Sequence, residues 1–203
     1  MKIAILGLGA YGIALAKTLV KKNEITMWSA FADEVAKVNS SRENSAAMKG
    51  IKLENEIRIT SDLKEAIETA RIIVIAVPMF AVREVCKSLN GIIEKQQIIC
   101  VVSKGVEKET YLFPSQVVHE ELPKAEVAMV SGPSFAIELA SGAETGLTIA
   151  SENEDNIYVI KEAFESSNLD FDTTCDLRGV QICRNYKKHL CHTFWNFNGK
   201  SEE

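Results

Sequence analysis

The chain has 203 residues, which is enough for one large domain or for one domain and part of another. Hydrophobic residues make up 46% and charged residues 25% of it, and the net charge is −5 with acids and bases interspersed. This composition is typical of a globular protein and argues against a nucleic-acid-binding or anionic-membrane surface. Apolar runs such as Ile72–Val77 are too short to span a bilayer, and we predict no signal peptide. The five cysteines have no framework spacing, so reduced thiols and a cytoplasmic location are expected.

Short apolar runs rich in β-branched residues predict eight buried strands in chain order: Lys2–Leu6, Ile25–Trp28, Ile57–Thr60, Arg71–Val77, Gln97–Ser103, Val127–Ser131, Leu147–Ser151 and Leu169–Asp172. Stretches with helical spacing separate most of them: Ala10–Lys22, Asp62–Thr69 with Ser61 as its N-cap, Met79–Leu89, Ser134–Leu139 and Asn156–Glu165. The polar stretch Asn39–Asn55 is expected to be a loop with a short helix. This alternation predicts an α/β fold with a doubly wound, mainly parallel sheet that is covered on both faces.

The character of the sequence changes after Asp176. Leu177–Cys183 can start a helix, but the following stretch is rich in Asn, Lys, His and aromatic residues without clean helical periodicity. A tail this short cannot build a second core by itself. We therefore divide the chain into a dinucleotide-binding domain, residues 1–176, and the truncated start of a C-terminal helical domain, residues 177–203.

The strongest single motif is Gly7-Leu8-Gly9-Ala10-Tyr11-Gly12, which follows a predicted strand and opens a predicted helix. In such a Rossmann-like turn Gly7 permits the tight turn, Gly9 lets the backbone approach a pyrophosphate, and Gly12 lets the helix pack closely on the strand. The helix N-terminus then offers N–H groups and a positive dipole end to the anion. The turn, with Ala10 and Tyr11, is therefore expected to bind NAD or NADP.

The end of the second strand usually distinguishes NAD from NADP, because an acid there binds the ribose 2′-hydroxyl and an Arg accepts a 2′-phosphate. Here the stretch reads Met27-Trp28-Ser29-Ala30-Phe31-Ala32-Asp33, with neither residue type at the strand end. Asp33 comes a few residues late and is expected to open the next helix. The cofactor preference therefore stays open. Trp28 is a candidate for the adenine side, and a half-buried strand aromatic is the alternative.

Several motifs together resemble the NAD(P)-dependent glycerol-3-phosphate dehydrogenase family. They are Gly7–Gly12 with Met27-Trp28, Ala76-Val77-Pro78 with Phe80, Val102-Ser103-Lys104-Gly105, Ser131-Gly132-Pro133-Ser134-Phe135-Ala136-Ile137-Glu138 with Ala140-Ser141-Gly142, and Gly179-Val180-Gln181. The resemblance extends from residue 1 to about residue 183, and the Ser-Gly-Pro-Ser-Phe-Ala block is its most specific part. It implies hydride transfer between NAD(P)H and dihydroxyacetone phosphate, which gives sn-glycerol 3-phosphate for phospholipid synthesis. It also implies an active site between a Rossmann-like domain and a helical domain, in an enzyme that can form a homodimer.

The resemblance assigns roles to single residues. Lys104, at the end of the fifth strand, would contact both substrate and cofactor, and a cation there suits an oxygen that gains negative charge during hydride transfer. Gly132 and Ser134 would line the substrate site, although Ser134 also suits the N-cap of the next helix. Ala136, Glu138, Pro78 and Phe80 would lie beside the cofactor. Glu138 can instead complement the helix dipole, and Phe80 can instead be a packing residue.

The family's proton-transfer lysine, counted from Gly179, falls at Lys187. Its surroundings, Cys183-Arg184-Asn185-Tyr186-Lys187-Lys188, depart from the small and apolar residues that the family has there. A one-base shift in the gene can turn this stretch into an apolar helix, so we consider a frameshifted tail as a hypothesis that the nucleotide sequence would test. An Asp beside the proton donor and a Ser-Arg-Asn run for the substrate phosphate are also absent. The chain is therefore expected to bind dinucleotide weakly and to turn over substrate poorly or not at all. It is also expected to associate with other molecules through exposed interface.

Three other readings stay open. Ketopantoate reductases and 6-phosphogluconate-type dehydrogenases share the first turn and a catalytic lysine, but they lack the Ser-Gly-Pro-Ser-Phe-Ala block. A dinucleotide-binding remnant would bind without turnover. A metal site formed by Cys183, His189, Cys191 and His192 matches no usual zinc spacing, so we predict no metal.

Overall fold

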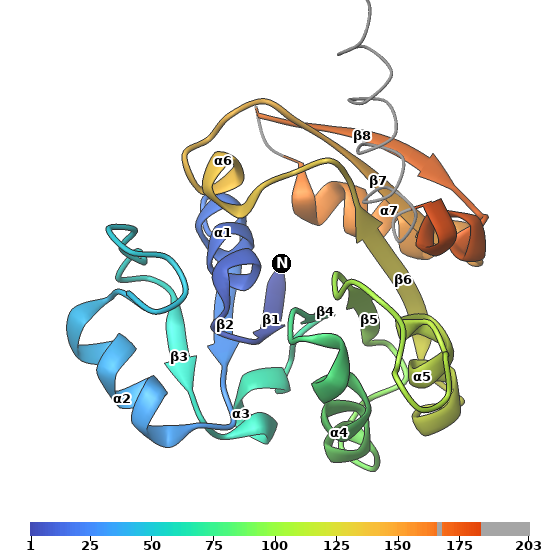
Figure 1. Cartoon of the computed structure of the whole chain (residues 1–203), viewed down its shortest axis with the longest axis horizontal. Coiled ribbons are helices and arrows are strands. Elements are labelled where there is room, and N and C mark those ends of the chain that lie inside the picture. Colours follow the sequence, from blue (N-terminus) through green and yellow to red (C-terminus); the bar gives the residue numbers. More distant parts are fainter. Residues whose placement is uncertain (166–167, 184–203) are drawn as a thin grey trace, which may run out of the picture.

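The computed structural model describes residues 1–165 and 168–183, in which helices cover both faces of one sheet (Figure 1). The strands are β1 (Lys2–Leu6), β2 (Glu24–Trp28), β3 (Arg58–Thr60), β4 (Ile72–Ile75), β5 (Ile98–Val101), β6 (Glu126–Ser131), β7 (Thr145–Ser151) and β8 (Leu169–Thr174). The helices are α1 (Ala10–Leu19), α2 (Ala32–Ser41), α3 (Leu63–Ile67), α4 (Met79–Leu89), α5 (Pro114–Glu121), α6 (Ala136–Ala140) and α7 (Glu154–Phe164). Residues 177–183 form a further helical segment.

The sheet has the order β3-β2-β1-β4-β5-β6-β7-β8. All neighbouring strands are parallel except β6 and β7, which are antiparallel. The predicted α/β, Rossmann-like, doubly wound and mainly parallel sheet is therefore confirmed. Because the strand order reverses between β1 and β4, a crevice is expected at the carboxyl ends of these two strands, where open α/β sheets bind ligands.

Two hydrophobic clusters fill the spaces above and below the sheet. Side chains alternate along each central strand, so that Ile3 and Ile5 join one cluster while Ala4 and Leu6 join the other. The first cluster also takes buried residues from α1, α2, α6 and α7, and the second takes them from α3, α4, α5 and the helical segment 177–183. Strands that are apolar on both faces give continuous hydrophobic runs, and this is why central strands such as β4 and β5 could be recognised in the sequence.

Two predicted helix caps were wrong. Asp62, not Ser61, caps α3, because its carboxylate accepts a hydrogen bond from the Glu65 N–H at 3.1 Å. Ser134 does not cap α6, which begins after Phe135, and the Ser134 hydroxyl instead reaches across to the glycine-rich turn. In both cases the residue types suit a cap, and the three-dimensional path of the chain decides which residue meets the N–H groups.

The segment 177–183 folds back onto the sheet. Asp176 caps it by accepting a hydrogen bond from the Gly179 N–H at 2.7 Å. Gln181 is 2% exposed and exchanges two hydrogen bonds with Ser115 of α5, at 2.8 Å from its amide and 3.1 Å to its carbonyl. The predicted helix at Leu177–Cys183 is thus confirmed, whereas the domain division at residue 176 stays a prediction.

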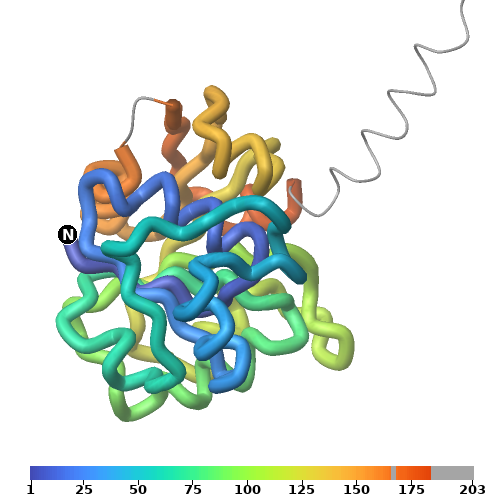
Figure 2. Tube along the Cα trace, turned by 90° about the vertical axis from the view of Figure 1, so that its left-hand side faces the viewer, coloured from blue at the N-terminus to red at the C-terminus, as the bar shows by residue number. Residues whose placement is uncertain are grey.

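The view turned by 90° shows the orange part of the chain, with β7, α7 and β8, at one end of the molecule and the green part at the other (Figure 2). Among the described residues, no helix has the length and apolar character that crossing a membrane requires.

Candidate functional site

The glycine-rich turn connects β1 to α1, and its three glycines meet different surroundings. Gly7 has a φ of +129°, and a Cβ on it would lie 2.7 Å from the Ala76 carbonyl oxygen. A Cβ on Gly12 would clash with the Gly7 carbonyl oxygen. A Cβ on Gly9, by contrast, would meet nothing within 4 Å. The fold itself requires Gly7 and Gly12, whereas the open space at Gly9 is what a ligand approaching the backbone would need.

The start of α1 is suited to an anion. The helix begins directly after Gly9, with no side-chain cap and no acid in its first turn. The first N–H groups of a helix have no partner within the helix, and they carry the positive end of its dipole. The turn and α1 together therefore form a cradle that the pyrophosphate of a dinucleotide fits.

Tyr11 brings together the ends of three strands. Its hydroxyl lies 3.0 Å from that of Ser134, which follows β6 and is buried. Its ring lies 5.8 Å from the Lys104 ammonium nitrogen, which follows β5. Lys104 itself is exposed to solvent. The structure thus gathers three of the predicted site residues, from positions 11, 104 and 134, at the carboxyl edge of the sheet.

The loop that carries Lys104 is held at two points. On one side, the Ser103 hydroxyl donates to the Val77 carbonyl at 2.6 Å. On the other side, Glu107 accepts two hydrogen bonds from Arg83 of α4, at 2.8 and 2.7 Å. The Arg83 guanidinium also holds Glu120 and Glu121 of α5 at 2.9 and 2.5 Å. The hydrogen bonds that Glu107 accepts, first of all those from Arg83, lower its pKa to about 2. The three carboxylates in turn raise the pKa of Arg83.

Pro78 and Phe80 lie at the start of α4, next to the reversal in strand order. Pro78 is the N-cap of that helix and is exposed. Phe80 is 85% exposed, so its ring is not packed against the described residues. An aromatic ring left in solvent beside the crevice suits a face of the cofactor.

Trp28 is buried rather than half-buried. It is 7% exposed, and its indole N–H donates to the Ser61 carbonyl at 3.1 Å. It belongs to the hydrophobic cluster that lies under α3 and α4. This gives the side chain a structural role, and its contact with cofactor stays a prediction.

Ala136 and Glu138 lie in the first turn of α6. Ala136 is half-buried and packs against the cluster under α1. The Glu138 carboxylate accepts from the Phe135 N–H at 3.4 Å, so it caps its own helix. The neighbouring Phe135 and Ile137 are 71% and 55% exposed. Glu138 is therefore an acid in the first turn of α6, where it complements the helix dipole as its alternative role requires, and its position beside the cofactor stays a prediction.

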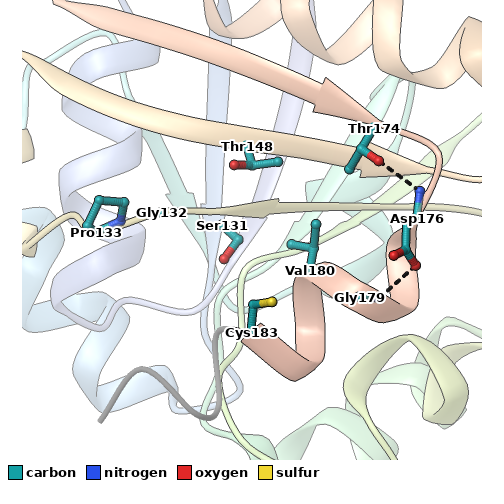
Figure 3. A pocket seen from close by; sticks show the side chains of 9 residues that line it. All are labelled: Ser131, Gly132, Pro133, Thr148, Thr174, Asp176, Gly179, Val180 and Cys183. Carbon is teal, nitrogen blue, oxygen red and sulfur yellow. Dashed lines mark hydrogen bonds between the residues drawn. The ribbon is translucent and has the colours of Figure 1, made fainter. Parts of the chain in front are cut away.

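A cavity of about 360 Å³ lies between β6, β7 and the helical segment 177–183. Figure 3 shows Ser131 and Thr148 of the sheet opposite Val180 and Cys183 of the helix. Gly132 lines one end of it, and a Cβ there would lie 2.6 Å from the Gly146 carbonyl oxygen. The close approach of β7 therefore explains this glycine without a ligand, and its predicted contact with substrate is compatible with the cavity.

A family model described as the N-terminus of NAD-dependent glycerol-3-phosphate dehydrogenase matches residues 2–157. The chain belongs to this family. Glycerol-3-phosphate dehydrogenase (NAD(P)+) of Fusobacterium nucleatum is 36% identical over 185 residues, which are 90% of this chain and 55% of the relative. The relative of the same name from Bacillus subtilis is 34% identical, over 89% of this chain and 54% of its own.

The fold agrees with that assignment. The crystal structure of glycerol-3-phosphate dehydrogenase from Coxiella burnetii matches with a TM-score of 0.85 and 30% identity, over 90% of this chain and 56% of that chain. The chain thus spans about half the length of the curated relatives that it matches. The resemblance that the sequence motifs indicated is confirmed.

The glycerol-3-phosphate dehydrogenase motif around Lys187 lies outside the described residues, as do His189, Cys191 and His192. Of the four tail residues considered as metal ligands, only Cys183 is described, and it is exposed. Within residues 1–165 and 168–183, no three His, Cys, Asp or Glu side chains are grouped as metal ligands.

Two features of the structure were not predicted. One is the Ser115–Gln181 contact, which gives a reason for the Gly-Val-Gln motif. The other is a carboxylate at the end of β2: Glu34 accepts hydrogen bonds from Ser29 at 2.5 Å and from Asn44 at 2.9 Å. Residues 29, 34 and 44 are far enough apart in sequence that only the fold shows them as one group.

Proposed function

We propose that this chain is the dinucleotide-binding half of an NAD(P)-dependent glycerol-3-phosphate dehydrogenase. The observation that carries the proposal is the convergence on Tyr11, which supports one site formed by the glycine-rich turn, Lys104 and Ser134. Family membership supports NAD or NADP as cofactor, and dihydroxyacetone phosphate and glycerol 3-phosphate as the substrate pair.

The proposed roles follow from the chemistry of the groups. The backbone of Gly7, Gly9, Ala10 and the start of α1 binds the pyrophosphate. When bound, the nicotinamide supplies or accepts the hydride. Lys104 stabilises the negative charge that develops on the carbonyl oxygen of the substrate, because an ammonium close to that oxygen favours the alkoxide.

On the substrate side, Ser134 and Gly132 orient the bound molecule next to Lys104. Lys187 remains our candidate for the proton transfer that completes the reaction. Pro78, Phe80, Ala136 and Glu138 shape the groove for the cofactor. We also propose a cytoplasmic location, which the odd number of cysteines supports, and the homodimer stays a prediction.

The experiment is to follow the oxidation of NADH and of NADPH by the purified chain with dihydroxyacetone phosphate, by the loss of nicotinamide absorbance. Cofactor binding is measured in parallel by quenching of protein fluorescence. Turnover supports the full activity. Binding without turnover supports the alternative, a dinucleotide-binding remnant. A chain that binds neither cofactor contradicts both.

A further inference from the structure

The carboxylate of Glu34 is folded back from α2 onto the end of β2. One oxygen accepts from the Ser29 hydroxyl at 2.5 Å, and Ser29 is the residue that directly follows the strand. The other oxygen accepts from the Asn44 amide at 2.9 Å. The same amide nitrogen also donates to the Leu8 carbonyl, in the glycine-rich turn, at 2.9 Å. A single side chain, 8% exposed, therefore ties the carboxylate to the turn that would hold the pyrophosphate.

Dinucleotide-binding folds recognise the adenosine ribose at the end of the second strand, which is β2 here. An acid that follows the glycine-rich turn by about twenty residues binds the ribose 2′-hydroxyl in NAD-dependent enzymes. Counted along the chain, Ser29, Ala30 and Phe31 follow the end of the strand, and none of them is an acid. In space, the Glu34 carboxylate is held against Ser29, directly after the strand, and Asn44 links it to Leu8 of the glycine-rich turn.

The charge around Glu34 favours a neutral ribose. Both of its hydrogen-bond partners are uncharged, and within the described part of the chain no ion pair neutralises it. The stretch from Trp28 to Val35 contains no Lys or Arg. Arg42, at the C-terminal end of α2, donates through its guanidinium to the carbonyls of Glu54 and Ile57. A 2′-phosphate, which carries close to two negative charges, would meet the like charge of the Glu34 carboxylate here.

We propose that Glu34 is the specificity-determining residue of the cofactor site and that it selects NAD over NADP. Its carboxylate accepts a hydrogen bond from the ribose 2′-hydroxyl and repels a 2′-phosphate. Ser29 and Asn44 act as positioning residues that hold it toward the glycine-rich turn. This inference rests on the proposed dinucleotide binding and adds to it the choice between the two cofactors.

The test is the ratio of dissociation constants for NADH and NADPH, measured by fluorescence titration of the purified full chain. We expect the unmodified chain to bind NADH at least about tenfold more tightly than NADPH, as a charge-assisted hydrogen bond on one side and a like-charge contact on the other imply. Glu34→Gln should bring the two constants to within about threefold, by weakening NADH and strengthening NADPH.

Asp33→Asn is the matched control, because it removes the same charge from the adjacent, exposed position of α2 and should leave the ratio unchanged. Thermal melting of each variant reports on folding, and Glu34→Ala serves as a second variant if the glutamine perturbs the Asn44 contact. A parent chain that binds both cofactors equally, or a ratio that Glu34→Gln leaves unchanged, overturns this inference alone. A parent chain that binds neither cofactor overturns the proposed function as well.

Discussion

At the scale of single residues, the glycines of the first turn are required for different reasons, and this separates folding from binding. Gly7→Ala would place a Cβ 2.7 Å from the Ala76 carbonyl at a φ of +129°, so it should lower the free energy of unfolding by roughly 2 kcal/mol or more. Gly9→Ala would place its Cβ in open space at an ordinary φ of −75°, so its melting temperature should stay close to that of the parent.

The same Gly9→Ala variant should weaken NADH binding by about tenfold or more, because the methyl group would occupy the space that the pyrophosphate needs. Thermal melting and fluorescence titration of both variants are the measurements. Equal affinity of the parent and Gly9→Ala for NADH would show that the cofactor does not approach this backbone.

The role of Lys104 can be tested with a matched control at a second lysine, Lys108, in the same loop. Lys104→Met should weaken NADH binding by about fivefold to thirtyfold, since a charge-assisted contact is worth roughly 1 to 2 kcal/mol at a partly exposed site. Lys108→Met removes the same charge from an exposed position of the same loop and should leave the affinity within about twofold. If both variants lose affinity equally, the effect is one of general charge and Lys104 has no particular role.

At the scale of elements, Arg83 joins α4, α5 and the Lys104 loop, and its removal would leave three carboxylates facing one another. The side chains of Arg83 and Glu107 are 21% and 11% exposed. Arg83→Met should therefore destabilise the fold by roughly 2 kcal/mol, which denaturant titration would measure. Lys87→Met, on the same helix and with an exposed partner, Glu84, should change the stability by less than about 0.5 kcal/mol.

The Arg83–Glu107 pair also predicts a pH dependence. The pKa of Glu107 is lowered from 4.5 to about 2 in the folded chain, first of all by its hydrogen bond with Arg83. The stabilisation is therefore complete above about pH 4.5 and is lost as the pH falls toward 2. Denaturant titrations between pH 5 and about 2.5 should show a decline in stability that is smaller in Glu107→Gln than in the parent. Parallel declines in the two proteins would contradict the assignment.

The contact between Gln181 and Ser115 joins the helical segment 177–183 to α5. Gln181→Leu would remove both hydrogen bonds with Ser115 and leave the buried Ser115 N–H without its acceptor, at a cost of about 1 to 3 kcal/mol. Hydrogen exchange in residues 177–183 should then be faster in Gln181→Leu than in the parent chain, and this increase should be larger than any in β1 or β4. Ser115→Ala, which removes only the hydroxyl contact, should show a smaller change. Unchanged exchange in Gln181→Leu would mean that Leu177 and Val180 hold the segment without it.

At the scale of the whole molecule, the sequence predicted the fold well because strands buried on both faces give apolar runs such as Ile72–Ile75. It predicted Tyr11, Lys104 and Ser134 as site residues because each follows a strand in a recognisable motif. It could not predict the Glu34 carboxylate, because the contact with Asn44 spans ten positions and a loop without periodicity. The caps at Asp62 and Phe135 were missed for a related reason, since several residues near each helix start suit a cap.

Exposed apolar side chains gather in the segments that follow β4, β5 and β6, and this predicts association. Phe80, Tyr111, Phe135 and Ile137 are between 55% and 85% exposed. Exposed apolar surface promotes contact with other molecules, so sedimentation velocity should show concentration-dependent self-association of the chain.

The double variant Phe135→Ser and Ile137→Ser should shift that equilibrium toward the monomer. Tyr158→Ser should not, because Tyr158 is 71% exposed but lies on α7, away from these segments. The comparison distinguishes association through one defined surface from association through general hydrophobicity. Both variants remove exposed apolar surface, but only the double variant removes it beside the site. If the two proteins associate equally, the apolar side chains beside the cofactor site are not what drives association.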